Sequence, residues 1–391
     1  MQIVRIRGVF KDYSWGSRDV LPAMFHYDAD GRPQAEAWFG VHPEGQARLE
    51  DGTLLKDYLE SDPEALFGEG SSAYVECFPL MLKVLAVNNP LSLHVHPDAE
   101  QAAIGWRNEE LDRRVGRDAS LLDYSDSNCK NELYYALTPS TLMCGFRDFD
   151  SIHHHLTRLL PCSFDRLFSR SGTIRGLVKT LFSLGGDELK TVIDEFLSSL
   201  QDAGEESRRG GVYYTERGIS ERIFSLFGHD ASVVMPYLMN VVHMRIGDAV
   251  YIHSGMLHTY VHGTGVELED SSDNEVRLGM SGKHKDIPAG LNLIDFEAGF
   301  SGKLDIRQDR FLRQRADGGT LSLAILPSGS YDIRERVPSI ALCTEGQARV
   351  GTSVDHVMLK EGECCFIPSC DEEYHIRVAG KVFQAVFPEK S

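Results

Sequence analysis

Residues 78–97 read FPLMLKVLAVNNPLSLHVHP, two short apolar runs separated by an Asn-Asn-Pro turn. Runs of this length, rich in valine, leucine and phenylalanine, are typical of β-strands. Successive side chains of a strand point to opposite faces, so Ser92, His94 and His96 share one face and the apolar residues between them share the other. The two imidazoles then lie about 7 Å apart along the chain, which allows them to converge on a metal ion. A pair of surface histidines would have the same pattern.

Short apolar runs separated by turn residues occur on both sides of this segment. Examples are AEAWFGVH (35–42) before it and YLMNVVHMRIGDAVYIH (237–253) after it. Between residues 148 and 235 the apolar positions instead recur every three or four residues, as in LKTVIDEFLSSL (189–200), and this is the period of a helix. The pattern predicts a mainly β protein with a helical insertion.

A weak internal repeat accompanies the later strands. IGDAVYIHSGMLH (246–258) and EGECCFIPSCDEE (361–373) share a glycine, an acidic residue, four mainly apolar residues and a turn. Two copies of one β-unit predict a duplicated jelly roll. In the second copy Cys370 and Glu373 stand where the first has Gly255 and His258.

Composition limits the kinds of partner. The chain has 391 residues, with 40 Lys or Arg against 58 Asp or Glu, a formal net charge of −18. This length suggests two or three folding units, and the acidic balance argues against a nucleic-acid or anionic-membrane partner. We find no apolar window long enough to span a membrane and no secretory signal, and the eight cysteines are scattered. We therefore expect a cytoplasmic protein with reduced thiols.

The histidine pair and the first copy of the repeat together resemble the cupin superfamily. The second cupin motif has Gly, five residues, Pro, one residue, Gly, two residues and His. Gly247, Gly255 and His258 fit this spacing, and His253 stands where the family usually has proline.

A more specific resemblance covers most of the chain. Several segments, in the same order, resemble the motifs of the type I mannose-6-phosphate isomerases, which are zinc-dependent cupins with a helical insertion. The segments are YSWGS (13–17), AEAWFGVHPEG (35–45), FPLMLKVLAVNNPLSLHVHPD (78–98), NCKNELYYALTP (128–139) and GTGVELEDSSDNEVRLGMSGKHKD (263–286). Several motif matches in the same order are far more specific than any single match.

This resemblance implies a domain organisation. Residues 1–147 and 236–310 would form the two parts of a catalytic cupin domain, with the metal site in the second part. Residues 148–235 would be the helical insertion, and residues 311–391 a C-terminal cupin domain without a metal.

The resemblance also implies a ligand set of His94, His96, Glu132 and His258 around one Zn²⁺ ion per chain. The family has Gln at the first of these positions, so His94 departs from its pattern. Imidazole also suits other divalent metals, which leaves the identity of the metal open. Without the resemblance, a solvated carboxylate on a strand is the preferred interpretation of Glu132.

The implied activity is the interconversion of mannose 6-phosphate and fructose 6-phosphate through an enediolate. Three residues are candidates for the chemistry: Lys130, Glu267 and Arg277. On a strand Lys130 shares a face with Glu132, and a neighbouring metal would lower the pKa of the lysine and make it a proton carrier. Glu267 and Arg277 match functional positions of the family, although each would otherwise be interpreted as half of an edge-strand salt bridge.

Binding of the sugar phosphate would need cationic or hydroxyl groups close to the metal face. Lys83 and Ser92 are the candidates, because Ser92 shares the metal face and Lys83 interrupts an apolar run. Lys283 and Lys285 are weaker candidates for contacts with the phosphate.

Cys129 stands where the family has a histidine, and a small packing residue is its preferred interpretation. Two other functions stay open at this point: a metal-cupin oxygenase, which a three-histidine site would also serve, and a regulator that binds sugar phosphates without turnover. The oligomeric state is left open by the sequence.

Overall fold

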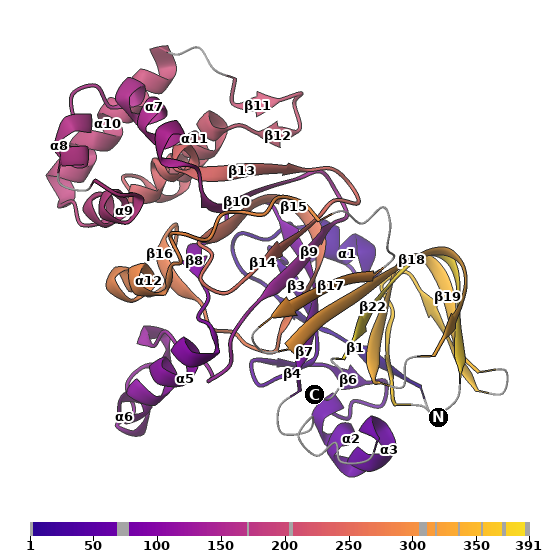
Figure 1. The fold of residues 1–391 in the computed structure, drawn as a ribbon. Coiled ribbons are helices and arrows are strands. Elements are labelled where there is room, and N and C mark those ends of the chain that lie inside the picture. The colour runs from indigo at the N-terminus through magenta and orange to yellow at the C-terminus, as the bar shows by residue number, and fades with distance from the viewer. Residues whose placement is uncertain are drawn as a thin grey trace.

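The computed structural model describes residues 3–387 except 69–77, 170–171, 203–205, 305–310, 317–318, 335–336, 353–354 and 370–372. Two large antiparallel sheets dominate this part of the chain, and a group of helices covers one end (Figure 1). The predicted mainly β fold with a helical insertion is confirmed. Among the described residues, no helix has the length and apolar character that a membrane span requires.

The first sheet has ten strands and carries the histidine pair. Its main path runs β13–β10–β15–β7–β3–β2, and β8, β9, β14 and β16 pair beside it. The bounds are β2 Val9–Lys11, β3 Glu36–Phe39, β7 Leu80–Val87, β8 Leu93–Val95, β9 Glu132–Ala136, β10 Ser140–Phe146, β13 Met239–Met244, β14 Ala249–Ile252, β15 His258–Asp270 and β16 Val276–Gly279. The two predicted strands of residues 78–97 are β7 and β8. Both pair with β15, β7 along its second half and β8 at its first residue.

The second sheet has eight strands and contains the C-terminal part of the chain. Its order is β17–β18–β22–β19–β21–β1–β6, and β20 pairs with β19. The bounds are β1 Val4–Arg7, β6 Arg48–Leu49, β17 Phe311–Ala316, β18 Gly319–Ile333, β19 Ser339–Gly351, β20 His356–Lys360, β21 Cys364–Ile367 and β22 Tyr374–Val386. The first strand of the chain therefore belongs to the sheet of the last strands, with Val4 opposite Phe366.

The two copies of the sequence repeat occupy corresponding places, one in each sheet. In each copy a short strand, β14 or β21, is followed by a strand of 13 residues, β15 or β22. The glycine before each short strand, Gly247 or Gly362, has a positive φ, 91° and 81°. Glu373 directly precedes β22, as His258 begins β15, whereas Cys370 lies outside the described residues.

Helices occupy most of the segment between β10 and β13. They are α7 Phe149–Leu159, α8 Phe164–Ser169, α9 Ile174–Phe182, α10 Gly186–Asp202 and α11 Glu216–Phe227, followed by the short turns η2 Ala231–Val233 and η3 Met235–Tyr237. A small hairpin, β11 Arg208–Arg209 with β12 Tyr213–Tyr214, interrupts them. Their apolar faces form one core with Leu93 and Val95 of β8 and with Leu278 of β16. The helices thus support the apolar face of the strand whose other face carries His94.

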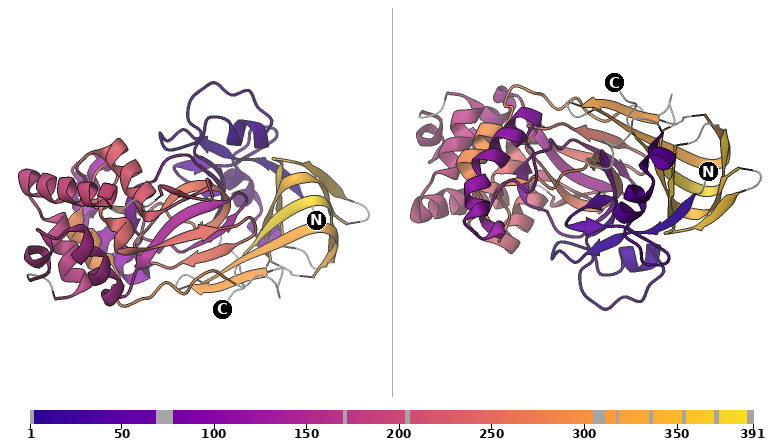
Figure 2. Two further views of the ribbon diagram at one scale, coloured as in Figure 1. Left: turned by 90° about the horizontal axis from the view of Figure 1, so that it is seen from above. Right: turned by 90° about the horizontal axis from the view of Figure 1, so that it is seen from below.

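The remaining helices lie in connections between strands. They are α1 Val20–Met24, α2 Leu55–Ser61, α3 Pro63–Phe67, α5 Ala99–Asn108, α6 Glu110–Arg114, η1 Ala119–Leu121 and α12 Ile287–Leu293, and the connection after β3 holds the hairpin β4 Val41–His42 with β5 Gly45–Gln46. The helical group and the second sheet lie at opposite ends of the molecule (Figure 2).

The two sheets share one hydrophobic core. Leu82, Leu133 and Leu268 of the first sheet and Leu342 and Phe383 of the second are buried in the same cluster. The rings of Tyr135 and Phe383 meet at 4.9 Å across the junction. This packing covers one face of the first sheet and leaves its other side for the functional site.

Candidate metal centre and active site

A cavity of about 460 Å³ opens on the first sheet beside β8 and β16. Eight residues singled out from the sequence line it: Lys83, Ser92, His94, Lys130, Glu132, Glu267, Arg277 and Lys283. His96 and His258 lie deeper, with 1% and 0% of their surface exposed. The fold therefore gathers residues from five strands and from the loop after β16 around one space.

Three imidazoles meet at the floor of this cavity. His94 and His96 lie on and directly after β8, and His258 begins β15, where it pairs with His94. The ring centres are 4.3 to 4.9 Å apart. The three residues offer ligand atoms that all lie within 4.8 Å of one another. Strand register, which sequence alone does not give, brings the third histidine to the pair.

Each imidazole is oriented by a backbone carbonyl. Nδ1 of His94 donates to the oxygen of Ser92 at 2.8 Å, Nδ1 of His96 to that of Asn274 at 2.6 Å, and Nδ1 of His258 to that of Met256 at 2.9 Å. A carbonyl oxygen only accepts, so Nδ1 carries the proton in each ring and Nε2 keeps its lone pair. All three rings are therefore prepared to act as ligands through Nε2.

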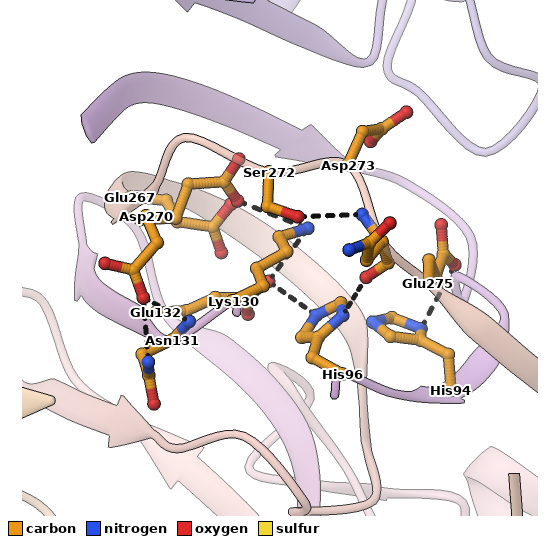
Figure 3. A network of polar contacts seen from close by, with 12 residues as sticks. His94, His96, Lys130, Asn131, Glu132, Glu267, Asp270, Ser272, Asp273 and Glu275 are labelled. Atoms are coloured by element: carbon orange, nitrogen blue, oxygen red, sulfur yellow. Dashed lines mark hydrogen bonds and ion pairs between the residues drawn. The ribbon is translucent and has the colours of Figure 1, made fainter. Parts of the chain in front are cut away.

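Glu132 completes the donor set. One of its oxygens lies 2.9 Å from Nε2 of His96 (Figure 3). The other lies 3.3 Å from Nε2 of His258. Burial and the nearby Lys130 lower the pKa of His96 to about 4, so the ring is neutral and two acceptors face each other. Nε2 of His258 is buried without a hydrogen bond. Three nitrogens and one carboxylate oxygen arranged in this way fit a divalent metal such as zinc.

Lys83 and Lys130 share a buried carboxylate that the sequence analysis missed. Oε1 of Glu269 lies 2.6 Å from Nζ of Lys83, and Oε2 lies 3.4 Å from Nζ of Lys130. Glu269 is completely buried, and burial raises its pKa to about 7. Its position two residues after Glu267 places both on one face of β15, a spacing that could have revealed it.

The surroundings of Lys130 act against the predicted lowering of its pKa. Burial alone would lower it, but attraction to Glu269 and Glu132 outweighs burial and raises the pKa of Lys130 well above its usual value. The Nζ of Lys130 is 3.3 Å from Glu132. The protein's own side chains thus hold a proton on this lysine, where we had considered only the effect of a metal.

Glu267 lies at the centre of the cavity wall. Its Oε1 accepts a hydrogen bond of 2.5 Å from the hydroxyl of Tyr260. Burial, reinforced by the charges of Glu132 and Glu269, raises its pKa well above the usual value. These surroundings favour the protonated form of Glu267.

Arg277 lies opposite His94 in the pairing of β16 with β8. Its guanidinium is 2.6 Å from Glu275, a second carboxylate that the sequence analysis missed. Glu275 also accepts a hydrogen bond from the hydroxyl of Ser92 and lies 3.3 Å from Nδ1 of His94. Ser92, which we predicted to contact phosphate, is therefore engaged within the protein.

Lys283 and Lys285 have different positions. Lys283 lines the cavity, and its ammonium lies 4.6 Å from the ring centre of Tyr13. Lys285 is not among the lining residues, and it pairs with Asp230 at 3.6 Å. The structure therefore separates two lysines that the sequence could not rank.

The lining is not dominated by positive charge. Among the described lining residues there are four bases and five acids: Lys83, Lys130, Arg277 and Lys283 against Glu36, Glu132, Glu267, Asp273 and Glu275. Three of the four cations are paired with carboxylates, because buried charges are stable only when they are paired.

Cys129 is buried and is not among the lining residues. Its sulfur lies 3.7 Å from Asp270, which also accepts hydrogen bonds from the backbone and side chain of Asn131. These contacts agree with the interpretation of Cys129 as a packing residue beside the strand that carries Glu132.

Comparison with known proteins identifies relatives of the whole chain. Residues 3–149 match a family model described as phosphomannose isomerase type I, catalytic domain. The mannose-6-phosphate isomerase of Escherichia coli (strain K12) is 29% identical over 392 residues, which cover 95% of this chain and 96% of that protein. Mannose-6-phosphate isomerase 1 of Arabidopsis thaliana is 26% identical, with 95% and 90% covered.

Solved structures agree over the same length. A crystal structure of a mutant phosphomannose isomerase from Salmonella typhimurium superposes with a TM-score of 0.85 at 25% identity and covers 99% of both chains. A mannose 6-phosphate isomerase structure described as bound with zinc and yttrium gives the same score, identity and coverage.

Proposed function

Because the chain belongs to the type I phosphomannose isomerase family, we propose that it is a metal-dependent isomerase that interconverts mannose 6-phosphate and fructose 6-phosphate. The observation that carries the proposal is the convergence of three imidazoles and Glu132 at the floor of a cavity that Lys130, Glu267 and Arg277 also line. Neither an oxygenase nor a binding regulator has support among the relatives.

The reaction moves a proton between two neighbouring carbons and passes through an enediolate. We propose His94, His96, Glu132 and His258 as the ligands of one zinc ion per chain. Such an ion polarises the substrate carbonyl and stabilises negative charge on the two neighbouring oxygens. The assignment of zinc is supported by the relative described as bound with zinc.

Lys130 and Glu267 are the proposed proton-transfer residues. Both hold a proton at rest, so one of them must release it before it can act as a base. Attraction to Glu269, 3.4 Å from its Nζ, and to Glu132 favours the charged form of Lys130, and a divalent metal bound to Glu132 would weaken that attraction and favour release of the proton. Glu267 can then donate its proton to a substrate oxygen.

Arg277 and Lys283 are the proposed phosphate contacts. Lys283 lines the cavity, and no described carboxylate forms an ion pair with it, whereas Lys83 is held by Glu269 at 2.6 Å and lies 4.4 Å from the ring centre of Trp38. We therefore place the phosphate toward Lys283 and the sugar toward Lys83 and Ser92. Binding of the phosphate can then orient the carbons that react.

The setting proposed for this activity is the cytoplasm, with a small sugar phosphate as the partner and neither nucleic acid nor membrane. The acidic chain supports this, since its net charge of −18 repels polyanions.

The test is a coupled assay on purified protein of measured metal content. Mannose 6-phosphate should yield fructose 6-phosphate, a chelator should abolish turnover, and added Zn²⁺ should restore it. Binding of the sugar phosphate without turnover in any metal form would overturn the proposal.

Two substitutions separate metal binding from the other steps. His258→Ala should lose both metal and activity, because it removes a ligand from a buried set. Arg277→Ala should keep the metal and lose most of the activity, about 100-fold or more in kcat/KM, since the guanidinium acts on the substrate. A fully active Arg277→Ala variant would show that this residue is misassigned.

A further inference from the structure

We propose that Glu275 is a positioning residue that orients His94 as a metal ligand and ties this imidazole to Arg277. The inference rests on the proposed metal site and assigns a role to a residue outside the ligand set. It starts from the geometry around His94, whose Nδ1 lies 3.3 Å from a carboxylate oxygen of Glu275.

The surroundings of His94 contain three acceptors close to one nitrogen. Nδ1 lies 2.8 Å from the carbonyl of Ser92 and 3.3 Å from the hydroxyl of Ser92. It also lies 3.3 Å from Oε1 of Glu275 (Figure 3). The Ser92 hydroxyl itself donates to the same oxygen of Glu275. These acceptors keep the proton on Nδ1 and turn Nε2 toward His96 and His258.

A carboxylate behind a ligating imidazole fixes the ring and increases its basicity. His96 and His258 have backbone carbonyl acceptors at Nδ1, whereas among the described contacts Nδ1 of His94 also lies close to a carboxylate, that of Glu275. The carboxylate of Glu275 thus adds a charged acceptor behind one of the three proposed imidazole ligands.

The other oxygen of Glu275 links the metal floor to the cavity wall. Oε2 lies 2.6 Å from the guanidinium of Arg277, and Arg277 is the cross-strand neighbour of His94. Both partners of the carboxylate are mostly buried, with 5% of the His94 side chain and 17% of the Arg277 side chain exposed. Glu275 therefore holds an imidazole with one oxygen and a guanidinium with the other.

The test measures the binding of Zn²⁺ alone, by competition with a chromophoric chelator and without any sugar. Glu275→Gln should weaken the affinity for Zn²⁺ about 10- to 100-fold. Asp273→Asn is the matched control, because Asp273 lines the same cavity and, within the part of the chain that the structure describes, forms no hydrogen bond or ion pair with His94. It should change the affinity less than threefold.

A double-mutant cycle shows whether Glu275 acts through His94. In a His94→Ala background the same Glu275→Gln change should alter the Zn²⁺ affinity less than threefold. The visible spectrum of the Co²⁺-loaded protein should change in Glu275→Gln and stay unchanged in Asp273→Asn, because only the former alters the orientation of a ligand.

An equal loss of affinity in both backgrounds, or no loss in either, would overturn the proposal. If Glu275→Gln does not fold, Glu275→Asp gives the same test, since it keeps the charge but withdraws it from Nδ1. Failure of the proposed isomerase activity would be visible separately, because none of these measurements uses a sugar.

Discussion

Glu269 is the residue on which the two buried lysines of the site depend. It is fully buried between Lys83 and Lys130, in an environment where an unpaired ammonium would be strongly destabilised. Lys130 has a second partner at 3.3 Å in Glu132, whereas the next carboxylate to Lys83, Glu36, is 3.9 Å away. The carboxylate therefore contributes both to the stability of the site and to the protonation of Lys130.

Glu269→Gln should lower the free energy of unfolding by about 3 kcal/mol, because it removes one partner from a buried ion-pair network. Urea unfolding measures the loss. Glu60→Gln removes the partner of Lys56 in an exposed pair and should cost less than about 0.5 kcal/mol. Equal losses in the two variants would show that the buried ion pairs stabilise the protein no more than the exposed pair does.

Individual residues of the site could be predicted from the sequence to different extents. The alternation of residues 92–96 is enough to place His94 and His96 on one face. Glu275 meets Ser92 across 183 positions of sequence, and the pairing of β16 with β8 creates that contact. Such register is decided by packing of the whole sheet, so sequence periodicity could not reveal it.

The glycines that precede β14 and β21 give a prediction about the stability of the two repeated strand units. Gly247 and Gly362 both have positive φ, so an alanine costs about 1–2 kcal/mol in backbone strain at either site. At Gly362 a Cβ would also lie 2.5 Å from the oxygen of Met24, whereas at Gly247 the nearest atom is 3.6 Å away. Gly362→Ala should therefore lose at least twice as much stability as Gly247→Ala.

Thermal or urea unfolding of the two variants measures this difference. Gly185→Ala is the control, because Gly185 has no neighbour within 4 Å of a Cβ and no positive φ, and it should be neutral or slightly stabilising. A larger loss at Gly247 than at Gly362 would contradict the argument from the close contact.

The sequence predicted whether a segment forms a helix or a strand more easily than it predicted which strands pair. The helical period of residues 148–235 and the strand pattern of residues 78–97 correspond to α7–α11 and to β7 and β8. The hairpin of β11 and β12 within the helical segment has only two residues per strand, too few to give a periodic signal.

The shared core of the two sheets makes the whole molecule the unit of unfolding. Ile376 is buried in a cluster of the second sheet that includes none of the three tryptophans, which are at positions 15, 38 and 106. Ile376→Ala should cost about 2–5 kcal/mol and shift the unfolding midpoint detected by tryptophan fluorescence as much as that detected by circular dichroism.

Ile246→Ala is the matched control for this change, because Ile246 is 61% exposed and should leave both midpoints in place. A fluorescence midpoint that stays fixed while the circular dichroism midpoint falls in Ile376→Ala would show that the two sheets unfold separately.

The pairing of β1 with β21 has a consequence for synthesis of the chain on the ribosome. Residues 4–6 emerge long before their partners at positions 364–366. Until then the apolar side chains of β1 have no permanent place, and the second sheet stays open at the position of this strand. We expect this interval to be the period in which the nascent chain depends most on holding chaperones and is most exposed to aggregation.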